Sequence, residues 1–160
     1  MFLKPNFNLE SIYNIDIVEL KKMGVKALFF DLDSTIMKSR SGKFSFQTLQ
    51  FLNDLKSNFK LAIVTNNRNA AYINKVKSQT DIPVFFNAKK PNVGVMLEAC
   101  EELEVDSHDC AMIGDRPLSD ILGGINAQMT TILVDSISKD EENFIVRFAR
   151  FLERLTIRKD

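Results

Sequence analysis

The stretch VKALFFDLDST, residues Val25–Thr35, joins a run of apolar side chains to two aspartates that lie two positions apart. A short, unbroken apolar run is typical of a β-strand buried on both faces, as in a parallel sheet. We therefore predict a buried strand over 25–30, with Asp31 and Asp33 directly beyond its carboxyl end. If the chain stays extended there, the two carboxylates lie on the same face.

Apolar runs of the same kind recur along the chain, separated by segments in which apolar residues follow helical spacing. We expect strands at residues 61–64, 83–86, 110–114 and 130–134, and helices at 46–57, 71–76, 119–127 and after Pro91. This alternation predicts an α/β fold, a parallel five-stranded sheet with helices on both faces. Ligands of such sheets bind beyond the carboxyl ends of the strands.

Composition bounds the class of protein. The chain has 160 residues, 45% hydrophobic and 26% charged, as in an ordinary globular domain. We expect a single domain over 1–160, with an N-terminal extension at 1–24 and an amphipathic C-terminal helix at about 140–158. The 21 basic and 21 acidic residues cancel, so no nucleic-acid partner is expected.

The sequence shows neither a secretory leader pattern nor an apolar run near the roughly 20 residues that a membrane span needs. Its two cysteines, Cys100 and Cys110, do not have the spacing of a metal or redox motif. We expect them to be free thiols in a reducing cytoplasm.

Polar residues that suit phosphate chemistry follow the predicted strands. Two carboxylates as close as Asp31 and Asp33 repel each other unless a cation or a proton intervenes. Mg²⁺ prefers oxygen ligands and keeps several waters, so a few protein oxygens suffice. With Asp115 after the fourth predicted strand, we expect Asp31, Asp33 and Asp115 to hold Mg²⁺.

The same residues suggest a mechanism of phosphoryl transfer. Asp31 would attack phosphorus and form an aspartyl-phosphate. Asp33 would donate a proton to the leaving oxygen and later activate water. The Thr65 hydroxyl, the Asn66 backbone N–H and the Lys90 ammonium would bind the phosphoryl oxygens.

Two neighbouring residues leave alternatives open. Lys89 competes with Lys90 for the phosphate; we favour Lys90 because it adjoins Pro91 and a predicted helix N-terminus, a natural anion site. Asp120 would orient Lys90, approach the metal or cap the following helix, and we do not count it as a primary ligand. Each short motif is common alone, whereas all of them in this order, each at a strand end, predict one site.

These motifs resemble those of the haloacid dehalogenase-like (HAD) phosphohydrolases: DLDST at 31–35, then Thr65, Lys90 and GDRPLSD at 114–120. The resemblance implies a Rossmann-like sheet with strand order 3-2-1-4-5 and dependence on Mg²⁺. It also implies that Asp33 reaches the metal through its backbone carbonyl. An acid at that position is typical of the phosphatases and phosphomutases of this superfamily.

Most of the chain resembles the YqeG-type members of subfamily IIIA, through the segments at 11–35, 64–67, 88–91, 114–124 and 146–154. This group includes a phosphatidylglycerophosphatase, so the resemblance implies a phosphatidylglycerol phosphate substrate and a role in phospholipid biosynthesis. Ser34 departs from the asparagine usual there. The alternatives are a phosphatase for soluble sugar or nucleotide phosphates, and a non-catalytic interaction module on the same scaffold. The intact acidic set argues against a pure scaffold.

The segments between the motifs are too short for a cap domain, so we expect an open site that accepts a large substrate such as a membrane lipid headgroup. Two adjacent stripes mark the C-terminal helix: Arg147, Arg150, Arg154 and Arg158, and Phe144, Phe148, Phe151 and Leu155. We favour a helix that packs on the domain through its phenylalanines, with the arginines in solvent. The alternative is peripheral contact with an anionic membrane, on its inner face.

Overall fold

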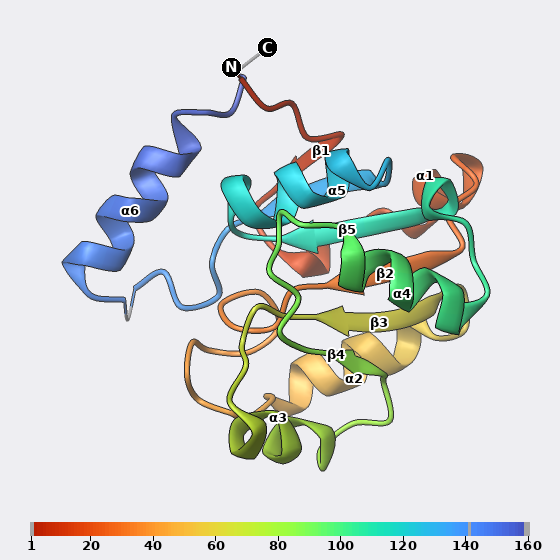
Figure 1. Ribbon diagram of the computed structural model, residues 1–160, viewed down its shortest axis with the longest axis horizontal. Helices are drawn as coiled ribbons and strands as arrows, with labels where there is room; N and C mark the ends of the chain where they lie inside the picture. The colour runs from red at the N-terminus through yellow and green to blue at the C-terminus, as the bar shows by residue number, and fades with distance from the viewer. Residues whose placement is uncertain (1, 141, 159–160) are drawn as a thin grey trace.

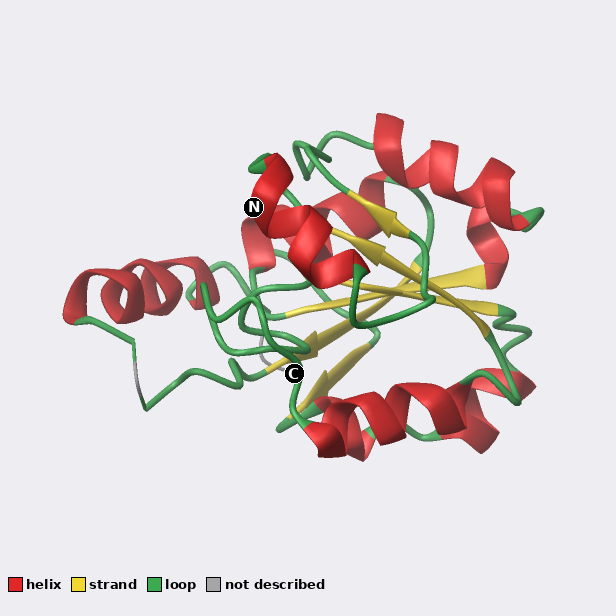
Figure 2. Cartoon of the chain, turned by 90° about the horizontal axis from the view of Figure 1, so that it is seen from below, coloured by secondary structure: helices red, strands yellow, loops and turns green. Residues whose placement is uncertain are grey.

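In the computed structural model, which describes residues 2–140 and 142–158, six parallel strands form one sheet with helices on both faces (Figures 1 and 2). The strands lie in the order β1-β6-β5-β2-β3-β4. Their bounds are β1 (Phe7–Leu9), β2 (Ala27–Phe30), β3 (Lys60–Val64), β4 (Val84–Phe85), β5 (Cys110–Gly114) and β6 (Thr130–Val134).

The predicted order 3-2-1-4-5 is confirmed for β2 to β6, but the predicted number of five strands is wrong. The additional strand, β1, comes from the stretch that we expected to be an extension, and it pairs in parallel with β6, Phe7 opposite Ile132. Asn6 strengthens this edge, since its Oδ1 accepts a 2.9 Å hydrogen bond from the Thr131 N–H. The pairing satisfies backbone groups that an uncovered edge strand would leave exposed.

Both faces of the sheet are buried, which explains the unbroken apolar runs. In β2, Leu28 and Phe30 face one core and Ala27 and Phe29 face the other, and all four are fully buried. The first core is packed by α1 (Ile17–Lys22), α2 (Phe46–Leu55) and α3 (Ala70–Lys77). The second is packed by α4 (Gly94–Leu103) and the end of α5 (Leu122–Asn126).

Side-chain caps fix where the helices of the first face begin. Asp16, Ser45 and Asn69 each accept a hydrogen bond from a backbone N–H in the first turn of α1, α2 and α3. Short turns complete the connections: η1 (Ile12–Asn14), η2 (Ser107–Asp109) and the π-helical η3 (Pro117–Ile121). The connections between the described strands contain no inserted cap domain, as expected.

The last helix, α6 (Phe144–Arg154), is shorter than expected and lies apart from both helical layers (Figures 1 and 2). It sits beyond the arrowheads of β3 and β5, at the carboxyl edge of the sheet (Figure 1). Among the described helices none is long and apolar enough to cross a membrane.

The favoured orientation of α6 is wrong. Phe144 and Phe151 are 78% and 57% exposed, whereas Arg150 is only 9% exposed and faces the domain. The reason is electrostatic, because the edge of the sheet presents carboxylates that pair with the inward arginines Arg150 and Arg154. An unpaired buried carboxylate costs more than an exposed phenylalanine ring.

Candidate active site

The site lies at the carboxyl edge of the sheet, where the ends of three adjacent strands meet. Asp31, Thr65 and Asp115 each come directly after a strand, β2, β3 and β5 respectively. Backbone hydrogen bonds continue the ladder past the strand ends, since the Asp31 N–H donates to the Ile113 carbonyl at 2.9 Å. The register of the sheet therefore sets the spacing of the functional side chains.

Lys90 lies at the centre of this group. Its Nζ donates to Asp31 Oδ1 at 2.9 Å, to Asp120 Oδ1 at 2.8 Å and to the Val64 carbonyl at 2.7 Å. Burial alone would lower the pKa of Lys90, but the charges of Asp120 and Asp31 outweigh it and raise the pKa above its usual range. Lys90 is therefore a fixed cation, whereas Lys89 is exposed, with a left-handed φ of 54°.

Asn66 holds Lys90 by its backbone. The Asn66 Oδ1 accepts a hydrogen bond from the Lys90 N–H at 2.7 Å, and its Nδ2 donates to the Lys90 carbonyl at 3.1 Å. Thr65 directly follows Val64, whose carbonyl accepts from Lys90 Nζ. It is buried, and its hydroxyl accepts a hydrogen bond from the Asn67 N–H at 3.1 Å. The loop after β3 thus fixes both the lysine and the hydroxyl.

Thr35 bridges two of the carboxylates. Its hydroxyl lies 3.2 Å from Asp31 Oδ2 and 3.0 Å from Asp115 Oδ1. A hydroxyl has one proton, so it serves only one of these acceptors at a time. Asp115 is fully buried, and burial, followed by the charges of Asp31 and Asp120, raises its pKa to about 8. Sequence analysis passed over Thr35, although it ends the DLDST motif.

Asp120 completes the acidic group, because Asp31, Asp115 and Asp120 each place a carboxylate oxygen within 4.8 Å of the others. Burial and the charge of Asp31 raise the pKa of Asp120 to about 6. Asp120 binds Lys90 and also accepts from the Arg116 N–H at 3.1 Å, so it both orients the lysine and caps a turn. A Cβ at Gly114 would lie 2.2 Å from Asp120 Oδ2, so only glycine permits this approach.

The Asp33 side chain contacts residues outside the acidic group. Its Oδ1 accepts from the Tyr72 hydroxyl at 2.5 Å and from the Arg40 N–H at 3.1 Å, and it is not part of the acidic group. The chain turns at Ser34, which has a left-handed φ of 71°. The Asp33 carboxylate therefore has partners other than those of the Asp31 carboxylate, which contacts Lys90. Tyr72, 39 residues away, gave no sequence signal.

Arg150 reaches into the site from α6. Its Nη2 lies 2.6 Å from Asp115 Oδ2, and its Nη1 contacts the carboxylate of Glu142. The sequence placed Arg150 in a solvent-facing stripe, because helical spacing does not reveal which face a carboxylate from another element will contact.

A fixed lysine among carboxylates at the carboxyl edge of a parallel Rossmann-like sheet suits the binding and transfer of a phosphoryl group. A family model described as HAD-hydrolase-like matches residues 87–151. The chain is 30% identical over 154 residues to the probable phosphatase YqeG of Bacillus subtilis, covering 96% of this chain and 88% of that protein. It therefore belongs to the HAD phosphatase superfamily.

Two further proteins are similar. Phosphatidylglycerophosphate phosphatase 1 of Arabidopsis thaliana is 26% identical over 167 residues, which is 99% of this chain and 48% of that longer protein. The crystal structure of a HAD phosphatase from Thermococcus onnurineus has a TM-score of 0.56 at 16% identity, over 74% of this chain and 89% of that one. This structural likeness concerns the fold.

Proposed function

We propose that the chain is a Mg²⁺-dependent phosphomonoester hydrolase that works through an aspartyl-phosphate. The observation that supports this most is the Asp31 carboxylate, held 2.9 Å from the Lys90 ammonium at the edge of the sheet. Asp31 forms the new bond to phosphorus while the bond to the leaving oxygen breaks, and Asp33 protonates that oxygen. Asp33 then takes a proton from the water that releases phosphate.

The acidic group fits a divalent cation. Asp115 Oδ2 is buried without a hydrogen bond, and three carboxylates this close favour a cation among them. Asp31 and Asp115 would bind it with their side chains, and Asp33, by the family resemblance, with its backbone carbonyl. Bound Mg²⁺ would cancel the repulsion between the carboxylate and the phosphate. Asp120 stays with Lys90, because both of its oxygens already accept hydrogen bonds.

Lys90 and the loop after β3 would bind the transferring phosphoryl group. The ammonium is fixed by three acceptors and would stabilise the developing charge by its positive charge, while a hydrogen bond to the phosphoryl group would replace the one to Asp31. The Thr65 hydroxyl and the Asn66 N–H would add donors from the same edge. The two hydrogen bonds between the Asn66 side chain and the Lys90 backbone keep these two residues in one arrangement.

Tyr72 would hold the Asp33 carboxyl group in the orientation from which it protonates the leaving oxygen. Burial and the hydrogen bond to Asp33 raise the pKa of Tyr72, so its hydroxyl remains a donor at neutral pH. We expect Tyr72→Phe to lower kcat about tenfold with little change in KM, because a misplaced proton donor slows chemistry without weakening substrate binding. Steady-state kinetics would test this. Tyr13→Phe, which loses a comparable bond to Thr48 away from the site, is the control; a rise in KM alone would contradict a positioning role.

We propose a phosphorylated lipid headgroup, phosphatidylglycerol phosphate, as the substrate. The similarity to the phosphatidylglycerophosphate phosphatase of Arabidopsis and the absence of an inserted cap among the described connections support this. The test is Mg²⁺-dependent phosphate release from phosphatidylglycerol phosphate in mixed micelles, compared with an aryl phosphate and with soluble sugar and nucleotide phosphates. Preference for a soluble substrate would overturn the lipid assignment, and no hydrolysis of any would favour a non-catalytic module.

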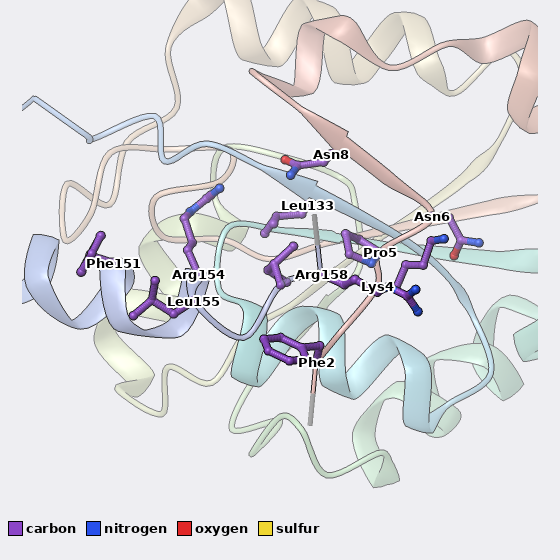
Figure 3. Close-up of a pocket in the computed structure, with 11 residues that line it drawn as sticks. Phe2, Lys4, Pro5, Asn6, Asn8, Leu133, Phe151, Arg154, Leu155 and Arg158 are labelled. Atoms are coloured by element: carbon purple, nitrogen blue, oxygen red, sulfur yellow. The ribbon is translucent and has the colours of Figure 1, made fainter. Parts of the chain in front are cut away.

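The outward side of α6 supports contact with the cytoplasmic face of an anionic membrane. Its exposed apolar residues are Phe144, Ile145, Phe148, Phe151, Leu152 and Leu155. A groove of about 1330 Å³ continues this surface, and Figure 3 shows Phe2, Phe151 and Leu155 lining it together with the cationic residues Lys4 and Arg158. Apolar surface beside cations is the chemistry that anionic lipid interfaces bind.

The double variant Phe148→Ser/Phe151→Ser is expected to lower binding to vesicles rich in phosphatidylglycerol about tenfold or more, since two rings no longer enter the interface. Co-sedimentation with vesicles measures this directly. Phe46→Ser is the matched control, because Phe46 is 82% exposed on α2, away from this surface. Equal losses in both variants, or equal binding to neutral vesicles, would contradict the assignment.

A further inference from the structure

We propose that the Arg150 guanidinium and a divalent cation compete for Asp115, so that each binds only when the other is absent. We call the contact of Arg150 with Asp115, which holds α6 against the metal site, the latch. Cation binding then frees α6 from the edge of the sheet. This inference rests on the proposed function only in taking Asp115 as a metal ligand.

The contacts of Arg150 show a close but incompletely matched pair. Its Nη2 lies 2.6 Å from Asp115 Oδ2, yet that oxygen receives no aligned hydrogen bond, and the Arg150 Nε is buried without a partner. A buried donor and a buried acceptor are thus left unsatisfied in the latched state, which is unfavourable. A cation that takes the Asp115 oxygen and releases the guanidinium to water relieves both.

The two partners of Asp115 exclude each other for reasons of space and charge. One oxygen of Asp115 is near the Thr35 hydroxyl and the other is near Arg150. A Mg²⁺ ion binds a carboxylate oxygen at about 2.0–2.1 Å and demands near-octahedral ligand geometry. A cation on the Asp115 oxygen that Arg150 now contacts would bring two positive charges together. The arginine must therefore leave Asp115 when the cation binds.

Glu142 links the latch to the loop of the nucleophile. Its carboxylate contacts Arg150 with one oxygen, and the other accepts from Ser34 at 3.2 Å and Ser136 at 2.9 Å. The Ser34 hydroxyl therefore attaches the segment just before α6 to the loop that carries Asp33.

The rest of α6 is attached mainly by polar contacts, which suits an element that detaches. Arg150 is its one buried residue among those described. Arg116 pairs with Glu153 at 2.5 and 2.8 Å, and Arg154 pairs with Asp135 at 3.2 Å. With little apolar surface buried, local release of the helix costs far less than global unfolding.

Binding measurements without substrate test the latch. Titration calorimetry with Mg²⁺ on the full chain should show that Arg150→Gln binds about tenfold tighter than wild type. Arg147→Gln removes the same charge from an exposed position of the same helix and should change affinity by less than about twofold. Equal affinities of wild type and Arg150→Gln overturn the latch and leave the proposed function standing. No binding by either overturns the metal assignment on which both rest.

Hydrogen exchange on the wild-type protein gives a second test that needs no variant. Saturating Mg²⁺ should speed amide exchange in α6, residues 144–154, and leave exchange in α2, residues 46–55, unchanged. Slower or unchanged exchange in α6 would overturn the proposal.

Discussion

Replacing Asp31 with asparagine is expected to lower Mg²⁺-dependent phosphate release at least about a thousandfold, because the amide cannot act as the attacking carboxylate. The change is nearly isosteric. Asp120, which lies 2.8 Å from the Lys90 ammonium, is unchanged in the variant, so the buried ammonium keeps a charged partner and the fold should persist. The loss therefore reports on chemistry.

Two measurements separate this role from a general effect on the site. Acid quenching during turnover with radiolabelled substrate should trap a phosphoenzyme in wild type and none in Asp31→Asn. The control is Asp81→Asn, which removes a carboxylate that is 81% exposed and pairs with Lys56 at the surface. It should retain full activity. A labelled phosphoenzyme in Asp31→Asn would assign the nucleophile to another residue.

The sequence revealed those parts of the site that local pattern and strand order determine. The buried strand before Asp31, and the strands before Thr65 and Asp115, could be predicted because both faces of the sheet are covered and every side chain in them except the exposed Lys60 is apolar. Parallel strands then bring their carboxyl ends together. Lys90 could be favoured over Lys89 from its place beside a helix start alone.

The residues that sequence reasoning missed depend on contacts between distant segments. Tyr72 reaches Asp33 from α3, and no periodicity within α3 indicates that partner. For α6, the amphipathic pattern predicted two faces but not which one packs inward. The carboxylates of Asp115 and Glu142 decide this, and only the assembled edge of the sheet places them near Arg150. The strand β1 was missed since three residues show too little alternation.

Lys90→Met should have the largest effect on stability, lowering the free energy of unfolding of the metal-free protein by about 3–5 kcal/mol, because removing one partner leaves buried charges uncompensated. Lys90 and Asp120 side chains are each only 1% exposed, and Asp31 lies on the other side of the ammonium. Hydrolysis should be lost as well, since the phosphoryl group loses its fixed cation. Lys89→Met, at an exposed neighbour, should cost less than about 0.5 kcal/mol.

The pH dependence of this loss follows from the same contacts. Burial raises the pKa of Asp120 to about 6, and the charge of Lys90 works against that rise. Without Lys90 the Asp120 pKa is higher still, so the folded variant binds a proton that folded wild type does not. The variant therefore gains stability relative to wild type as pH falls, and urea unfolding should show a smaller difference at about pH 5 than at about pH 8. A difference that grows on acidification would show that Lys90 does not compensate the Asp120 charge.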